Sequence, residues 1–150
     1  MTKISLKENP IVFALPASGK SYFVDHHKSF SFWEPSWNFE ITPTIASARW
    51  KEMKIFAKQG FVLSALPHTL LEEIRKDGRK FYYILPSDSE EMEKEYRRRF
   101  LERGDLKGAS LTKRNFGGLR NHLERAREIP NLEVILIEDP NVFLSDILTI

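Results

Sequence analysis

The sequence predicts an α/β domain in three layers, with helices on both faces of a mostly parallel sheet of about five strands. Short runs of strand length alternate along the chain with longer segments of helical period. Strand runs such as IVFAL (11–15) and VILI (134–137) are apolar throughout, as expected for strands that helices bury on both faces. The length of 150 residues suits one domain that spans residues 1–150.

Each expected strand is an apolar run bounded by proline, glycine or polar turn residues. The runs are residues 11–15, 61–66, 81–85 and 132–137, with a further short strand and a loop within the aromatic-rich residues 29–43. Residues 1–10 are polar and end in Asn-Pro, so we expect a loose lead-in before the first strand.

Helices are expected between these strands and after the last one. The segments of helical character are 19–27, 45–59, 67–76, 88–103, 116–128 and a last short helix after Asp139-Pro140. Gly60 and Gly104 end two of them. Ser87 and Glu90 have the spacing of a capping box.

Residues 106–115 are expected to form a loop, and the segment expected to be mobile spans residues 104–118. Four glycines punctuate this segment, and basic residues lie between them. A polar loop with glycine hinges is poorly packed, so it would be mobile without ligand. We therefore expect it to close over bound phosphates as a lid.

The composition excludes several classes of function. The chain has no cysteine, which excludes disulfides, thiol catalysis and thiolate metal sites, and which fits a cytoplasmic protein. No apolar run approaches the roughly 20 residues that cross a bilayer, and the start lacks the apolar middle of a signal peptide. We expect no membrane partner. The net charge of +2 is too small to predict nucleic-acid binding by itself, but basic residues gather between 97 and 127, which favours a local anion site.

Residues 14–21, ALPASGKS, match the phosphate-binding loop pattern G-x-x-x-x-G-K-S/T, except that alanine stands at the first glycine. In such a loop successive backbone N–H groups wrap the β-phosphate of a nucleotide, and the following helix N-terminus adds its positive end. The residues expected to contact the nucleotide are Ala14, Pro16, Ala17, Ser18, Gly19, Lys20 and Ser21.

Three positions of this loop have separate tasks. Gly19 permits close approach of the backbone, Lys20 reaches the β- and γ-phosphates, and the Ser21 hydroxyl ligates Mg²⁺. An apolar strand run precedes the motif and a helical pattern follows it, which is the context that such a loop requires. An ordinary strand–turn–helix joint is the alternative, and it is less favoured because motif and context agree.

The chain resembles the small P-loop kinase-like proteins that are common in bacteriophages, which are relatives of nucleoside monophosphate and polynucleotide kinases. Besides the loop, residues 62–74, 82–104 and 133–148 carry the likeness, so that it covers most of residues 11–148. Within the second segment, the helix residues that match are Glu95, Tyr96, Arg99, Arg103 and Gly104.

This resemblance implies a P-loop NTPase or kinase-like fold and a phosphotransferase that uses ATP or another nucleoside triphosphate with Mg²⁺. The acceptor would be a nucleoside, a nucleoside monophosphate or a nucleic-acid 5′ end, and the compartment the cytoplasm, that of the host if a phage encodes the protein. Lys20 would act on the donor, and Arg99 and Arg103 would neutralise charge during transfer. Without the resemblance, periodicity alone predicts that the two arginines lie on a solvated helix face, where neighbouring glutamates balance their charge.

One departure leaves a second hypothesis open. Related proteins often carry an aspartate soon after the first helix, near the metal or the acceptor, where this chain has serines. Asp25 and Glu34 are the nearest acids that could orient the acceptor or the metal. His68 joins them because it follows a strand's carboxyl end, where ligands bind in open α/β sheets, whereas His122 is expected at the surface. The alternative function is a catalytically degenerate nucleotide-binding module with a role in interaction or assembly.

Overall fold

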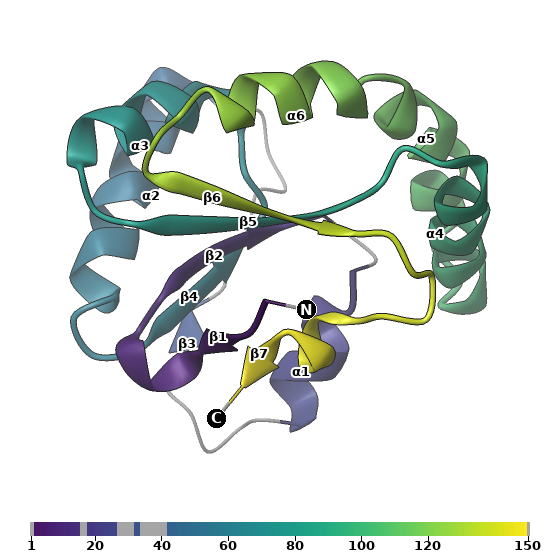
Figure 1. The fold of residues 1–150 in the computed structure, drawn as a ribbon, viewed down its shortest axis with the longest axis horizontal. Coiled ribbons are helices and arrows are strands. Elements are labelled where there is room, and N and C mark those ends of the chain that lie inside the picture. The colour runs from purple at the N-terminus through teal and green to yellow at the C-terminus, as the bar shows by residue number, and fades with distance from the viewer. Residues whose placement is uncertain (1, 16–17, 27–31, 34–41, 150) are drawn as a thin grey trace.

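A parallel five-stranded sheet forms the centre of the computed structural model, which describes residues 2–15, 18–26, 32–33 and 42–149 (Figure 1). The strand order is β3-β4-β2-β5-β6, and all neighbours run parallel. The strands are β2 (Ile11–Ala14), β3 (Phe32–Trp33), β4 (Phe61–Ser64), β5 (Phe81–Pro86) and β6 (Leu132–Ile137). The α/β class with a parallel sheet is therefore confirmed.

Helices flank this sheet and extend past one end of it. They are α1 (Lys20–His26), α2 (Pro43–Phe56), α3 (Leu71–Asp77), α4 (Glu90–Glu102), α5 (Leu106–Gly117) and α6 (Leu119–Arg127). Figure 1 shows α3 and α6 on one face of the sheet and α1 on the other, with α4 and α5 beyond the carboxyl end of β5. None of the described helices is long and apolar enough to cross a membrane.

The core lies around the central strand β2, which is buried along its whole length. Phe13 of β2 stacks on Phe81 of β5 with ring centroids 6.3 Å apart, and Trp50 of α2 packs on the same ring at 5.3 Å. Strands buried on both faces need apolar residues at successive positions rather than at alternate ones. That requirement is why the apolar runs of the sequence predicted these strands.

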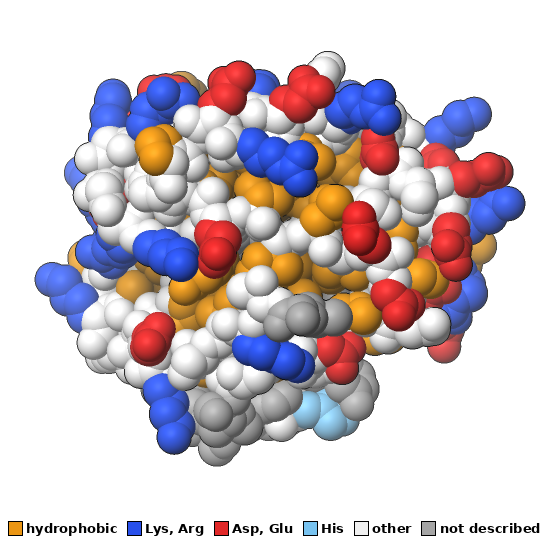
Figure 2. All heavy atoms as spheres, in the orientation of Figure 1, with side chains coloured by type: hydrophobic (Ala, Val, Ile, Leu, Met, Phe, Trp, Pro, Cys, Tyr) orange, Lys and Arg blue, Asp and Glu red, His pale blue; other side chains and the backbone are white. Residues whose placement is uncertain are grey.

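One edge of the sheet is β6. Figure 2 shows apolar side chains gathered in the middle of this face, between the charged groups of the surrounding elements. Ile135, Ile137 and Ile147 are buried and line a cavity of about 200 Å³. Ile147 comes from the C-terminal segment, which thus packs beside the edge strand.

The predicted loose lead-in at residues 1–10 is wrong. Strand β1 (Ile4–Ser5) pairs in parallel with β7 (Leu148–Thr149), and the 3₁₀ turn Leu6–Glu8 follows it. Ile4 and Leu6 are 2% and 1% exposed. Two buried apolar side chains, set between polar neighbours, therefore anchor a segment whose overall composition is polar.

The predicted loop within residues 104–118 is also wrong, because Leu106–Gly117 forms α5. Asp105 caps the helix by accepting a hydrogen bond from the N–H of Gly108 at 2.8 Å. Ala109, Thr112 and Phe116 are buried at helical spacing. The expected lid movement rested on an unpacked loop, and a helix packed against α4 removes that basis.

The start of α4 differs from its prediction by two residues. Ser89 is the N-cap and accepts a hydrogen bond from the N–H of Met92 at 3.2 Å, whereas the predicted capping residue was Ser87. The Ser87 hydroxyl instead donates to the Ser89 hydroxyl at 3.3 Å. The chain offers two serines at this strand end, and β5 continues through Pro86, which places the cap at the later one.

Substitution of the α5 glycines tests the packing of this helix. A Cβ atom at Gly108 would lie 2.4 Å from Cδ1 of Phe100, so Gly108→Ala should destabilise the protein by about 1–3 kcal/mol through overpacking. Nothing lies within 4 Å of a Cβ at Gly117, and there alanine should stabilise by up to about 1 kcal/mol through helix propensity. Urea unfolding of both variants measures the difference. Equal stabilities would mean that α5 does not pack on α4 as described.

Candidate functional site

The turn between β2 and α1 carries the phosphate-loop motif and closes on itself. The Ser18 side chain is buried, and its hydroxyl donates to the carbonyl of Leu15 at 2.5 Å. The Ser18 N–H donates to the same carbonyl at 3.3 Å. Gly19 follows with φ +101°, and α1 starts at Lys20. The turn therefore lies at the carboxyl end of the central strand.

Gly19 is required at its position for two reasons. Its φ of +101° lies in the region that L side chains rarely adopt. A Cβ atom there would also lie 3.2 Å from Cδ1 of Phe143. The N–H of Leu144 donates to the carbonyl of Ser18 at 3.4 Å, so the C-terminal segment packs directly on the turn.

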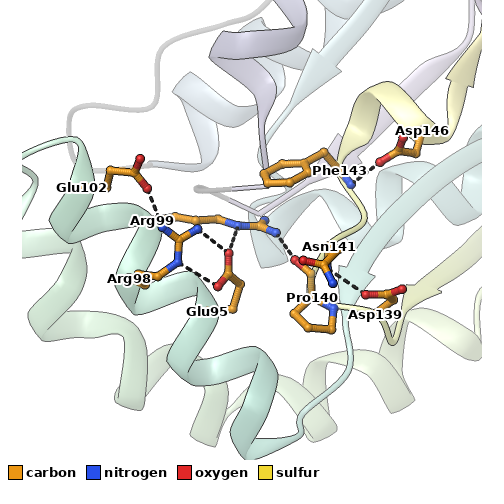
Figure 3. Close-up of polar contacts among 9 residues, drawn as sticks. All are labelled: Glu95, Arg98, Arg99, Glu102, Asp139, Pro140, Asn141, Phe143 and Asp146. Atoms are coloured by element: carbon orange, nitrogen blue, oxygen red, sulfur yellow. Dashed lines mark hydrogen bonds and ion pairs between the residues drawn. The ribbon is translucent and has the colours of Figure 1, made fainter.

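Arg99 of α4 reaches the same C-terminal segment (Figure 3). Its guanidinium carbon lies 4.0 Å from the ring centroid of Phe143 and 4.8 Å from that of Tyr96. One nitrogen donates to the carbonyl of Pro140 at 2.7 Å, and Nε donates to Glu95 at 3.2 Å. Phe143 thus lies between Arg99 and the Gly19 turn, which brings one predicted arginine close to the motif.

The charge of buried Arg99 is balanced by Glu95, which it shares with Arg98. Arg98 makes two hydrogen bonds to this carboxylate, at 2.9 and 2.7 Å. The hydrogen bonds from Arg98, and to a smaller extent that from Arg99, lower the pKa of Glu95 below its usual value. Glu95 is therefore a carboxylate that holds Arg99 in its present position.

Arg103 has different neighbours from Arg99, although the two residues are one helical turn apart. It is the C-cap of α4 and lies over the ring of Phe100, 4.7 Å from the centroid. Its guanidinium is 3.5 Å from the carboxylate of Asp105. Arg103 is half exposed, so it belongs to the junction of α4 and α5 rather than to the contact with the C-terminal segment.

The structure describes only some of the other predicted residues. Ala14 is the buried last residue of β2, and Lys20 is the half-buried first residue of α1. Asp25 is exposed near the end of α1. Pro16, Ala17, Glu34 and the Ser21 side chain lie outside the described part of the chain. Within that part, no three His, Asp or Glu side chains form a group that could hold a metal ion.

Tyr83, His122 and His68 form a polar chain next to this turn that the sequence did not predict, buried at Tyr83 and His122 and exposed at His68. His122 of α6 is only 8% exposed, so its predicted surface position is wrong. The Tyr83 hydroxyl and Nε2 of His122 are 2.6 Å apart, and Nδ1 of His122 is 3.0 Å from Nδ1 of His68. Leu119, His122 and Ala126 form the buried stripe of α6, and this spacing was the available signal.

Desolvation keeps both histidines uncharged at neutral pH, although His122 is buried and His68 is exposed at the surface. Desolvation lowers the pKa of His122 to about 4, and repulsion by Arg125, and by His68 once that ring is protonated at acidic pH, adds to this effect. Desolvation and Arg125 also lower the pKa of His68. Burial raises the pKa of Tyr83, so its hydroxyl stays protonated.

A cavity of about 250 Å³ lies against this chain of polar groups and reaches the turn. Leu15 borders it from the turn, and Leu66 and His68 border it from the segment after β4. The opposite wall comes from the end of α5 and the start of α6, over residues 114–122. The cavity therefore lies beside the carboxyl end of β2, where His68 was predicted to be near a ligand.

The two histidines should make stability depend on pH. Their pKa values are lower in the folded protein than in the unfolded chain, so the unfolded chain binds more protons below about pH 6.5. The free energy of unfolding should be highest above pH 7 and should fall as the pH decreases from 7 to 5. Urea unfolding at pH 5, 6 and 7 measures this slope, which His122→Gln should reduce. An unchanged slope in that variant would contradict the assignment.

Comparison with known proteins identifies no family for this chain. No model of a known protein family matches the sequence. No curated protein matches it either. The functional conclusion therefore depends on the residues and geometry of the site itself.

Proposed function

We propose that this protein has a P-loop kinase-like fold and transfers the γ-phosphate of ATP, or of another nucleoside triphosphate, with Mg²⁺. The acceptor is a nucleoside, a nucleoside monophosphate or a nucleic-acid 5′ end. The observation that carries the proposal is the position of the motif at the carboxyl end of β2. The chain continues on one side of β2 with β3 and β4 and then crosses to β5 on the other side. Ligands of open parallel sheets bind outside the carboxyl ends of the strands at such a reversal.

The backbone of the turn supports binding of phosphates. The positive φ of Gly19 and the 3.2 Å approach of Phe143 leave no room for a side chain at this point. A residue without a side chain of its own lets phosphate oxygens approach the neighbouring N–H groups closely. Lys20 follows directly and would contact the β- and γ-phosphates. Mg²⁺ bound to the Ser21 hydroxyl would offset the phosphate charge.

Arg99 supports phosphoryl transfer because its guanidinium stacks on Phe143, and Phe143 packs against Gly19 of the turn. In its present position it donates to Glu95 and to the carbonyl of Pro140. To contact a transferring phosphoryl group it must exchange one of these partners for a phosphate oxygen. A positive charge on the equatorial oxygens of that group lowers the barrier to transfer.

The same contacts favour the second candidate, a nucleotide-binding module without catalysis. Arg99 is 8% exposed and held by a carboxylate, which suits a structural role for the residue. The aspartate expected after the first helix is also replaced by serines. Such a module would bind the triphosphate at the turn and serve in interaction or assembly.

A screen of acceptors with labelled ATP separates the two candidates. Nucleosides, nucleoside monophosphates and 5′-hydroxyl oligonucleotides are each incubated with the protein, Mg²⁺ and ATP carrying a labelled γ-phosphate. The proposal predicts labelled product with at least one of these acceptors. ATP binding in calorimetry without any labelled product would support the module.

A further inference from the structure

The Tyr83 hydroxyl determines the protonation of the polar chain beside the cavity. Tyr83 is 1% exposed, and its raised pKa keeps the hydrogen on the oxygen. Within the described part of the chain its hydrogen-bond partner is Nε2 of His122, at 2.6 Å. A buried hydroxyl hydrogen without an acceptor is costly. The hydroxyl therefore donates, and Nε2 of His122 accepts.

This donation fixes the tautomers of both histidines. A neutral imidazole that accepts at one nitrogen carries its hydrogen on the other. His122 therefore has its hydrogen on Nδ1 and donates it to Nδ1 of His68, 3.0 Å away. His68 in turn accepts at Nδ1 and carries its own hydrogen on Nε2. Protonation of either ring would place two N–H groups face to face or leave the Tyr83 hydrogen without an acceptor.

The charges around the cavity agree with neutral rings. Arg114 of α5 borders the cavity and Arg125 of α6 acts on both histidines, and both are positive. No described residue that lines the cavity is a carboxylate that would stabilise an imidazolium. The hydrogen-bonded chain therefore ends in an uncharged N–H donor on His68, which is exposed and lines the cavity.

We propose that this cavity binds the nucleobase of the phosphoryl acceptor, with the Nε2–H of His68 donating to a ring nitrogen or carbonyl oxygen of the base. Leu15, Leu66 and Leu119 provide apolar walls for a flat ring, and Asn115 adds an amide at the rim. A pocket with apolar walls and few oriented polar groups is typical of small-molecule sites. Because the Nε2–H group of His68 belongs to a neutral ring, it favours an uncharged base over a phosphate group as its partner.

The position of the cavity links the base to the phosphates. Leu15 borders the cavity, and its carbonyl accepts the hydrogen bonds that close the turn. A nucleoside whose base contacts His68 would thus have its sugar near the Gly19-Lys20 turn. To this extent the inference rests on the proposed function, which identifies the ligand as the acceptor.

Nitrogen NMR of the full chain labelled with ¹⁵N-histidine tests the inference without an activity assay. Long-range ¹H–¹⁵N spectra distinguish the two neutral tautomers and the charged ring, and the chain has four histidines to assign. At pH 7.5 we expect the Nδ1–H form for His122 and the Nε2–H form for His68. Tyr83→Phe, which removes the donor, should abolish the preference of His122. A charged His68, or a His68 with its hydrogen on Nδ1, would overturn the assignment.

The ligand is tested in the same sample by adding adenosine, guanosine, cytidine and thymidine in turn, without ATP. At least one nucleoside should shift the Nε2 signal of His68, and His68→Leu should weaken its binding about fivefold through the lost hydrogen bond. His26→Leu, a change of an exposed histidine on α1, is the matched control and should bind normally. The proposal would be overturned if no nucleoside shifts the Nε2 signal of His68, or if inorganic phosphate shifts it and the nucleosides do not.

The two proposals fail in different ways. If a nucleoside binds at His68 but ATP does not bind at the turn, the phosphotransferase function fails and the nucleobase site stands. If ATP is bound and its phosphate transferred while His68→Leu leaves acceptor binding unchanged, the nucleobase site alone is contradicted.

Discussion

Replacing Lys20 with alanine should weaken the binding of ATP by about tenfold or more, because a charge-assisted contact with phosphate is lost. The fold should persist, since Lys20 is a half-buried residue at the first position of α1. Titration calorimetry with ATP and Mg²⁺ measures the affinity, and thermal unfolding verifies that the variant is folded.

Lys51→Ala is the matched control for this change. Lys51 is an exposed lysine on α2, so its removal changes the net charge by the same amount at a different helix. The control should bind ATP as the unmodified chain does. Equal affinity in Lys20→Ala and Lys51→Ala would mean that residues 14–21 form a plain turn.

Arg99→Ala should destabilise the protein by about 2–3 kcal/mol, because the part-buried carbonyl of Pro140 loses its charged donor and Glu95 keeps only its exposed partner Arg98. The substitution removes the donors to Glu95 and Pro140 and uncovers the ring of Phe143. The total stability of a domain is about 5–15 kcal/mol, so the variant should remain folded at room temperature. Urea unfolding at pH 7 measures the loss.

Arg98→Ala is the control that separates a buried contact from a surface one. Arg98 also bonds to Glu95 on the same helix, but its side chain is 57% exposed. Its removal should cost less than about 1 kcal/mol, as for most exposed ion pairs. A similar small loss in both variants would contradict the structural role of Arg99.

Kinetics of the same variants address the role of Arg99 in transfer. If its charge acts on the transferring phosphoryl group, Arg99→Ala should lower kcat more than it weakens ATP binding. If Arg99 only holds the C-terminal segment in place, the folded variant should retain the turnover of Arg98→Ala. The comparison therefore distinguishes a residue that acts on phosphate from one that supports the turn.

The central strands of the sheet were predictable from the sequence because strands buried on both faces have apolar residues at successive positions. Ile11–Ala14 and Phe61–Ser64 are examples, and both coincide with fully buried strands of the structure. Strand β1 was not predictable in this way, because it has two residues and its partner β7 lies at the opposite end of the chain. Its identity as a strand comes from long-range pairing rather than from local pattern.

Helix α5 was not predicted because its glycines indicated a loop. The helical spacing of Ala109, Thr112 and Phe116, which are buried, was the signal in favour of a helix. Gly108 is a small residue that accommodates the ring of Phe100, so it marks close helix packing rather than a break. His122 was missed for a related reason, since one polar residue in an apolar stripe resembles a surface residue. Its partner Tyr83 lies on a distant strand, and only the fold brings the two together.

At the candidate site, the sequence indicated the turn and two arginines, but it did not show that only Arg99 contacts the C-terminal segment. The spacing of Glu95 and Arg99 is visible in the sequence and predicts their ion pair. The stacking of Arg99 on Phe143, and of Phe143 against Gly19, depends on the path of the C-terminal segment across the turn. Such contacts are set by tertiary packing and have no local signal.

The most direct test of the proposed function is transfer of label from γ-labelled ATP to a panel of nucleosides, nucleoside monophosphates and 5′-hydroxyl oligonucleotides. The unmodified chain and Lys20→Ala are compared at equal concentration with Mg²⁺. The proposed function predicts a labelled product with at least one acceptor, formed by the unmodified chain and at least tenfold more slowly by Lys20→Ala. Labelled product formed equally fast by both proteins, or no labelled product with any acceptor, would contradict it.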